Sequence, residues 1–323
     1  MPRAAFVPET YHLTGDDVRL ILKRIGRGRL LKDSMRRFWA ADGGSHSRAL
    51  AHAAILTFFP GLIAVVGVAT AFQLPTFQAA LQRTITALTP GPAGRILNEA
   101  LLQGSKASGA AALVGGIAAA MISGTTAMTQ IQRGANRIYG LHEDRPPIRR
   151  YGLAFVMNLS AGLLLVAAFA LLAGGGTLSS AAHAGGWSHD AYIAFAIGRW
   201  PVGVVLATVA ITMVLKIAPN RRQPKGSWLV SPTLLSAALW LTFTALLALY
   251  FSFDAQLGRT YGPLLGIVGL LLWAYLTAVA LYLGFAFAAQ LEAVRSGHPQ
   301  PHQQVRLSFQ ETQVVPWRTA PPA

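Results

Sequence analysis

The sequence contains no cysteine and few charged residues. Of its 323 residues, 12% are Asp, Glu, Lys or Arg, whereas soluble domains carry about a quarter. The absence of cysteine excludes disulfide bonds, thiolate metal sites and a cysteine nucleophile. The shortage of charge, together with a 53% share of hydrophobic residues, indicates that lipid rather than water surrounds most of the chain.

Catalytic and metal-binding motifs are also missing. The eight histidines are scattered, and neither an H-E-x-x-H motif nor a glycine-rich phosphate loop is present. Prolines between His298 and His302 keep these two imidazoles off one helical face. We therefore expect no metal and no cofactor. Ser123-Gly124 matches an intramembrane serine hydrolase in two common residues only, so a hydrolase is the weaker hypothesis.

Long apolar runs dominate what is present. Each is nearly free of charge and long enough to cross about 30 Å of hydrocarbon as a helix. The runs cover residues 48–72, 109–128, 153–175, 195–217, 232–253 and 263–288. The sequence therefore predicts an all-α polytopic membrane protein with about six transmembrane helices.

The positive charges predict the orientation of these spans. Lys and Arg concentrate in residues 1–48, 133–150, 216–225 and the tail, and they are sparse in the alternate loops. Basic loops stay on the cytoplasmic side, so we expect a bacterial inner-membrane protein with both termini in the cytoplasm. The same rule explains the net charge of +15 without nucleic acid, which we do not expect as a partner.

The spans divide the chain into three parts. Residues 48–293 form the expected transmembrane domain, in which loop 73–108 holds two short helical pieces, 76–88 and 93–103. The proline-rich residues 294–323 are predicted to be a disordered cytoplasmic tail.

Residues 1–47 are basic and amphipathic. Apolar residues recur at helical spacing on either side of Gly26–Gly28: Val18, Ile21, Leu22 and Ile25, then Leu31, Met35 and Phe38. Two interpretations remain open. The helices lie in the interface against anionic lipid headgroups, or they pack on the cytoplasmic underside of the bundle.

Small residues recur at every fourth position in the second span. They are Ser108, Ala112, Gly116, Ala120 and Gly124. Such a face lets helices approach closely. We favour packing within the chain, with a homo-oligomer interface as the alternative.

A polar face follows at the inner end of that span. Arg133, Asn136 and Arg137 share one side of a helix, and Tyr139 comes next. Donors at headgroup depth suit a phosphate or carboxylate, so these residues are candidate substrate ligands. The alternative is a positive-inside anchor whose helix end is hydrogen-bonded by Asn136. His52 is a further candidate, because an ionisable residue within a span is costly to bury. Its alternative is a hydrogen bond to a neighbouring helix.

Several motifs resemble the YihY/BrkB family of bacterial inner-membrane proteins, formerly labelled ribonuclease BN. The resemblance covers residues 35–293 in family order. The motifs are Ala49-Leu-Ala-His-Ala-Ala-Ile-Leu-Thr-Phe-Phe-Pro60, Ala135-Asn-Arg-Ile-Tyr139, Ala218-Pro-Asn220 with Trp228, Pro232, Trp240 and Tyr250, Tyr261-Gly262, Gly266 and Leu272-Trp-Ala-Tyr275. The chain departs from the family at His52, at Ser231-Pro-Thr233, and at Ala286, where relatives carry an intramembrane Glu.

The resemblance implies a six-helix membrane protein of poorly defined activity, with transport of envelope lipid precursors among the suggested roles. The leading hypothesis is a translocator of an amphiphile or a small anionic solute. An envelope scaffold linked to virulence is the main alternative, and nothing in the residues supports a ribonuclease. Gating or structural roles are expected at Pro60, Pro219, Asn220, Pro232, Trp240, Tyr261, Gly262 and Trp273.

Overall fold

The computed structural model describes residues 3–10, 15–71, 109–141, 144–168, 171, 188–224, 226–253 and 255–302. These residues are helical apart from short connections and one isolated β-bridge. The helices are α1 (Gly15–Ile25), α2 (Arg27–Ala40), α3 (Gly43–Ala71), α6 (Gly109–Ile138), α7 (Pro147–Met157), α9 (His189–Ile217), α10 (Gly226–Phe253) and α11 (Ala255–Arg295). A π-helical turn, η1 (Asn158–Gly162), continues α7. The all-α prediction is confirmed for these residues.

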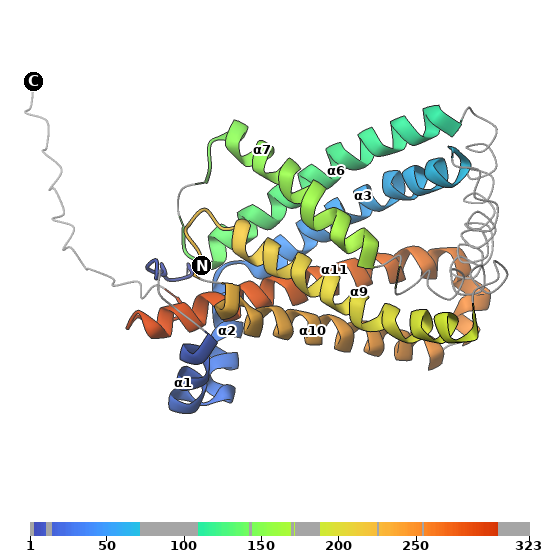
Figure 1. The fold of residues 1–323 in the computed structure, drawn as a ribbon. Helices are drawn as coiled ribbons and strands as arrows, with labels where there is room; N and C mark the ends of the chain where they lie inside the picture. Colours follow the sequence, from blue (N-terminus) through green and yellow to red (C-terminus); the bar gives the residue numbers. More distant parts are fainter. Residues whose placement is uncertain are drawn as a thin grey trace, which may run out of the picture.

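Four of the described helices are long and apolar enough to cross a membrane. They cover Pro147–Ala168, His189–Ile217, Ser227–Leu247 and Val268–Arg295. Helices α3 and α6 coincide with the first two predicted spans, and they run beside the other long helices in one bundle (Figure 1). The chain is therefore a candidate multi-pass membrane protein, whereas a total of six spans stays a prediction. Loop 73–108 lies outside the described residues.

Glycines bring α3 and α6 into close contact. A Cβ atom added at Gly116 would lie 2.6 Å from the backbone nitrogen of Ala64, and one at Gly67 would lie 2.6 Å from Cα of Leu113. Gly124 meets the side chain of Asn158 in η1. Part of the predicted small-residue face thus serves packing within the chain, and a homo-oligomer through the rest of it stays a prediction.

Helix α11 is the central helix of the bundle. Half of its span is buried, against 22–28% for the other three candidate spans. It contacts α2, α3, α6, α9 and α10. The ring of Tyr282 lies against Gly134 of α6, and its hydroxyl donates to the carbonyl of Gln130 (2.8 Å). Ala286 is fully buried in the main core.

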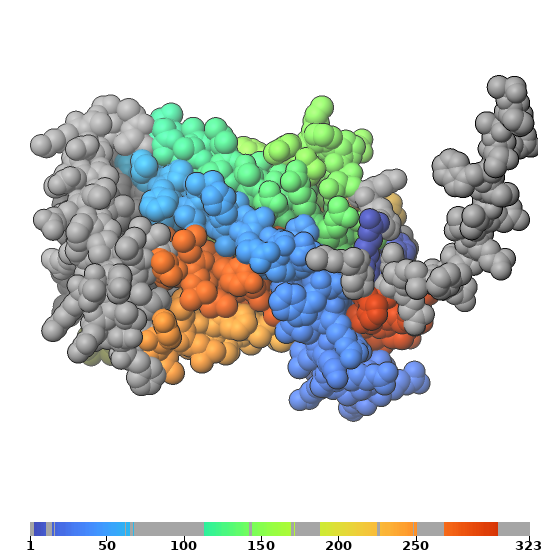
Figure 2. Space-filling model, turned by 180° about the vertical axis from the view of Figure 1, so that it is seen from behind, coloured from blue at the N-terminus to red at the C-terminus, as the bar shows by residue number. Residues whose placement is uncertain are grey.

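Helices α1 and α2 form a hairpin that projects sideways from one end of the bundle (Figures 1 and 2). Val18, Ile21 and Leu30 pack against α10 and α11 through Trp228 and Leu291. The hairpin thus packs on the underside of the bundle, as the second interpretation of residues 1–47 expects.

The structure divides the predicted apolar face of α2. The buried residues are Leu30, Ser34, Arg37 and Phe38, whereas Leu31 and Met35 are exposed. Arg37 has hydrogen-bond partners inside the protein. The buried face of α2 therefore contains a guanidinium group and is not wholly apolar.

The segments that precede and follow the helical bundle in sequence contact each other at one end of it. Ala4 and His302 form an antiparallel β-bridge, and the backbone N–H of His298 donates to the carbonyl of Ala293 (2.8 Å). Residues 296–302 therefore lie against this end of the bundle, while a disordered tail stays a prediction. We call this end the base: residues 3–10, α1, α2, loop 218–224, residues 296–302 and the C-terminal ends of α6 and α11. The remainder of the bundle is called the shaft.

Candidate functional site

The polar face predicted at the end of α6 is divided by the fold. Asn136 and Tyr139 are buried, Arg133 is half-buried and Arg137 is exposed. All of them lie at the base, yet they do not point to one shared surface. The predicted ligand set therefore separates into residues that hold the protein together and residues that remain accessible.

Asn136 joins three segments of the base. Its Nδ2 donates to Oδ1 of Asp144 (2.7 Å), and its Oδ1 accepts from the backbone N–H of Asn220 (2.7 Å). Both the nitrogen and the oxygen of the Asn136 amide are therefore hydrogen-bonded within the protein. These contacts favour the alternative in which Asn136 fixes the helix end over a role as a substrate ligand.

Arg145 clamps the end of α9. Its guanidinium donates to the carbonyl oxygens of residues 217–219 at 2.7–3.2 Å. The last carbonyls of a helix lack partners within the helix, and a cationic donor satisfies them well. Pro219 and Asn220, predicted as gating or structural residues, are thus held by Arg145 on one side and Asn136 on the other. Their contacts favour a structural role.

A buried ion pair lies behind this loop. Arg221 Nη2 is 2.8 Å from Glu292 Oε2, and both side chains are fully buried. The hydroxyl of Tyr139 donates to Glu292 Oε1 and that of Thr10 to Oε2, each at 3.2 Å. The Arg221 guanidinium also lies 4.7 Å from the centroid of the Tyr139 ring. These contacts offset the desolvation of two charges, which is costly when a pair is incompletely hydrogen-bonded.

Tyr139 acts as a permanent donor in this network. Burial, followed by the negative charge of Glu292, raises the pKa of the Tyr139 hydroxyl well above its ordinary value, so it stays protonated. Gln223 Oε1 lies 3.4 Å from the same hydroxyl, and its buried Nε2 has no partner among the described residues. Exchanging O and N of that amide would let Nε2 donate to the Tyr139 oxygen.

A second buried guanidinium, Arg37, ties together both outer segments. Its Nε donates to Gln290 Oε1 (2.9 Å), and its Nη atoms donate to the carbonyls of Ala5 (2.8 Å) and Gln300 (3.1 Å). Burial lowers the pKa of Arg37 to about 10, so the group is still charged at neutral pH. We call Arg37, Tyr139, Arg221, Gln290 and Glu292 the polar hub.

The two remaining arginines form an accessible cationic site. In the part of the chain that the structure describes, Arg133 and Arg137 have neither an ion pair nor a hydrogen bond through their side chains. They lie close enough to half-buried His46 to affect its titration. Burial is the largest cause of the lowered pKa of His46, and both arginine charges lower it further. We call Arg133, Arg137 and His46 the arginine corner.

The other predicted residues lie along the shaft. His52 is exposed on α3, and Pro60 lies within the same continuous helix. Pro232 is buried within α10. The structure therefore gives His52 no part in the hub.

Aromatic residues of the predicted set connect α10 and α11. Trp273 Nε1 donates to Oγ1 of Thr244 (3.2 Å), and Trp240 is half-buried on α10. Tyr261 and Gly262 fall in the part of α11 whose side chains lie outside the description.

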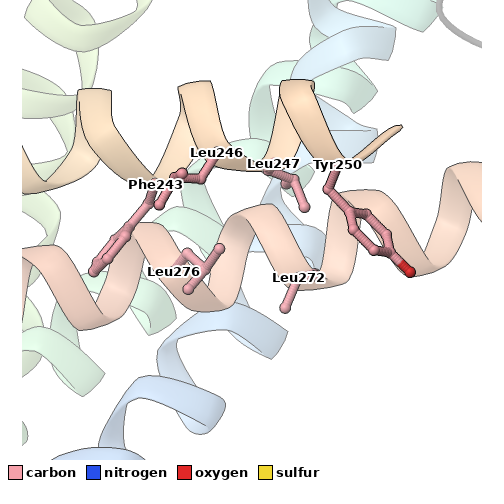
Figure 3. A pocket seen from close by; sticks show the side chains of 6 residues that line it. All are labelled: Phe243, Leu246, Leu247, Tyr250, Leu272 and Leu276. Atoms are coloured by element: carbon pink, nitrogen blue, oxygen red, sulfur yellow. The ribbon is translucent and has the colours of Figure 1, made fainter. Parts of the chain in front are cut away.

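An apolar groove runs between α10 and α11 on the shaft. Its volume is about 380 Å³. Its lining residues are Phe243, Leu246, Leu247 and Tyr250 from α10 and Leu272 and Leu276 from α11 (Figure 3). The groove is lined almost wholly by hydrocarbon, which suits an alkyl chain rather than a charged group.

Sequence reasoning missed most of the polar hub. Arg37 had a detectable signal, because Leu30, Ser34 and Arg37 recur at i, i+4 and i+7 and so share one face of α2. Arg221 and Glu292 had none. They are 71 positions apart, and a single sequence does not show that they meet.

Comparison with known proteins identifies relatives. The sequence model of a family described as Virulence factor BrkB matches residues 34–307. The ribonuclease-like protein YfkH of Bacillus subtilis (strain 168) is 26% identical over 256 residues, which cover 79% of this chain and 92% of that protein. No solved structure matches the chain.

Proposed function

The chain belongs to the BrkB virulence-factor family, and on that premise we propose that it translocates an anionic amphiphile across the bacterial inner membrane. The arginine corner carries this proposal. Arg133 and Arg137 present two guanidinium groups that no described residue engages, at the end of a long apolar helix. Guanidinium groups bind phosphate and carboxylate through charge-assisted hydrogen bonds. The corner thus offers a headgroup site at the point where the shaft meets the base.

The apolar groove supports an amphiphile over a small anionic solute. A ligand with an alkyl chain gains from burial against Phe243, Leu246 and Leu276, whereas a compact anion does not. In the proposed arrangement the headgroup meets the arginine corner while the chain stays on the apolar surface of the shaft. A small anionic solute remains the alternative substrate.

The proposal includes an arrangement in the bilayer. Helices α3 and α6 provide the two further spans, and the base with its positive charge faces the cytoplasm. The α1–α2 hairpin then lies at the membrane surface. One face of the hairpin packs on the bundle. On the face that does not, Leu31, Met35 and Trp39 are exposed beside Lys32 and Arg36. A stripe of apolar side chains next to a basic stripe suits anionic lipid headgroups.

Flux measurements in proteoliposomes test the proposal. The purified protein is reconstituted with fluorescent anionic lipid, in parallel with fluorescent zwitterionic lipid. We expect flux of the anionic lipid, with a loss of about tenfold or more in the Arg133→Ala, Arg137→Ala double variant, because two charge-assisted contacts are removed.

A matched control separates recognition from loss of charge. The Arg149→Ala, Arg222→Ala variant also removes two exposed arginines, one in the first turn of α7 and one in loop 218–224, and it should retain wild-type flux. Equal flux in the corner variant and the wild type would remove the arginine corner as the site. No flux of either lipid, combined with a stably co-purifying envelope protein, would favour the scaffold hypothesis.

The relative's ribonuclease-like name calls for one further assay. We expect no cleavage when the purified protein is incubated with labelled RNA, because its sequence lacks a recognisable constellation for acid–base or metal-assisted phosphodiester cleavage. Turnover that persists in chromatographically pure protein would reverse this expectation.

A further inference from the structure

Residues 3–10 run in extended form across the base. Ala4 and Val7 are buried in the main core, while Phe6 between them is 52% exposed. The backbone N–H of Ala5 donates to the carbonyl of Pro301 (3.3 Å), and that of Val7 donates to the carbonyl of Tyr139 (3.1 Å). The segment therefore covers the end of α6, with one bridge residue, Ala4, paired to His302.

The segment is held mainly through its backbone carbonyls. Arg37 donates to the carbonyl of Ala5 (2.8 Å), and Arg221 donates to those of Val7 (2.9 Å) and Pro8 (3.0 Å). Both guanidinium groups belong to the polar hub. A charged donor forms a stronger hydrogen bond than a neutral one. Arg37 and Arg221 therefore contribute much of the stabilisation that holds residues 3–10 in place.

The position of the segment relates it to the arginine corner. Gly140 follows α6 with φ of +70°, and a Cβ atom there would lie 2.7 Å from the Ala5 carbonyl oxygen and the Phe6 nitrogen. The backbone of the segment thus rests directly on the residue that ends α6. Arg137 lies in the last turn of that helix.

Removing residues 3–10 would take hydrogen-bond partners from several residues of the polar hub at once. With residues 3–10 in place, Arg37 and Arg221 are sealed from water and have carbonyl partners. Without the segment, both guanidinium groups and Glu292 lose partners, and water must replace them. A buried polar network is stable when satisfied and costly when half satisfied, so it favours two discrete arrangements over intermediate ones.

We propose that residues 3–10 are a latch that closes the base over the end of α6 and must leave its place before an anionic headgroup passes Arg133 and Arg137. The latch rests on the translocation function proposed above. Its closed state is the arrangement described here, in which Arg37 and Arg221 hold the backbone of the segment. In the open state the end of α6 is uncovered and the hub is hydrated.

A disulfide staple tests the latch directly, because the chain has no native cysteine. Ala4 and His302 face each other in an antiparallel bridge flanked by the Ala5–Pro301 hydrogen bond. Such a non-hydrogen-bonded pair has Cα atoms about 4.5 Å apart, within disulfide range. We expect the oxidised Ala4→Cys, His302→Cys variant to lose flux and to regain it in reductant. The two single-cysteine variants serve as controls. Equal flux in the oxidised and reduced forms would overturn the latch.

Cysteine labelling gives a readout that does not depend on transport. Buried Val7→Cys should react slowly with a soluble maleimide, at a rate set by opening, whereas the exposed control Phe6→Cys should react at once. Arg221→Gln should speed the labelling of Val7→Cys about tenfold, because charged hydrogen bonds to the segment are lost.

The two readouts separate the two proposals. Absence of flux in every variant, together with labelling of Val7→Cys that the staple suppresses, would refute translocation and leave the latch standing. Flux through a protein in which Val7→Cys never reacts would refute the latch and leave translocation standing.

Discussion

The base and the shaft of this chain differ in the groups that they bury and the groups that they expose. The base buries charge: Arg37, Arg221 and Glu292 are sealed from solvent and hydrogen-bonded on several sides. The shaft exposes hydrocarbon, for example at Val204 and Leu241, which are more than half exposed. The base thus resembles the interior of a soluble protein, while the outer surface of the shaft suits lipid.

The difference lies in what holds each region together. Lipid is as apolar as leucine, so burial of hydrocarbon does not favour contact between spans, and close steric fit must do so. The contact of Gly116 with Ala64 is of this kind. At the base, water competes for every polar group, and directional hydrogen bonds select one arrangement of loops. Helix α11 belongs to both regions, because it carries Tyr282 in the packed shaft and Glu292 in the hub.

Breaking the ion pair at the base should have the largest effect. Glu292→Ala leaves the Arg221 guanidinium buried without its carboxylate, and such a loss costs about 3–5 kcal/mol in the free energy of unfolding. The measurement is thermal unfolding of the purified protein in detergent. The neighbouring exposed residue supplies the control, Arg222→Gln, which should stay near wild type.

The double variant Glu292→Gln, Arg221→Gln sharpens the same result. With both charges absent no unpaired ion remains, so we expect it to be more stable than either single variant. Single variants that behave like Arg222→Gln would show that the pair does not hold the base together.

Disturbing the steric fit of the shaft should have a smaller effect. Gly116→Val places a side chain against the backbone of Ala64, and overpacking of this kind costs about 1–3 kcal/mol. Gly115→Val is the matched control, because nothing lies within 4 Å of a Cβ atom at Gly115. Both variants share the same change in helix propensity, so the difference in their unfolding temperatures reports the α3–α6 contact. Equal temperatures would contradict the proposed role of Gly116.

The shaft was more predictable from sequence than the base. Runs of apolar residues place the long helices, and the spacing of Gly116 and Gly124 indicates a close-packing face. These signals are local and periodic. On α2, periodicity identified Leu31, Met35 and Phe38 as one apolar face, but it did not show that the fold buries Arg37 and leaves Leu31 and Met35 exposed.

The candidate site was only partly predictable. The pattern of Arg133, Asn136 and Arg137 made the end of α6 a candidate site, but it did not show that Asn136 holds loop 218–224. The polar hub depends on contacts between segments far apart in the chain, such as Thr10 with Glu292. Composition and spacing in a single sequence carry no information about such pairs.

The smallest predicted effect concerns His46, which lies where the base meets the shaft. Burial lowers the pKa of His46 from its ordinary 6.5, so the folded protein resists a proton that the unfolded chain accepts. Where the unfolded state binds more protons, stability rises with pH. Lowering the pH below 6.5 should therefore cost the wild type at most about 1.4 kcal/mol per pH unit. In His46→Gln this loss should be absent, whereas the exposed control His52→Gln should keep it.

The same titration examines the arginine corner. Arg133 and Arg137 add to the lowering of the pKa of His46, while Asp42 and Asp144 oppose it. Removing both arginines should therefore raise the pKa of His46 towards its ordinary value and flatten the dependence of stability on pH. An unchanged slope in the Arg133→Ala, Arg137→Ala variant would mean that the arginines do not act on His46. The charge of Arg133 and Arg137 on α6 would then have no electrostatic effect on the imidazole of His46 on α3, and His46 would not belong to the arginine corner.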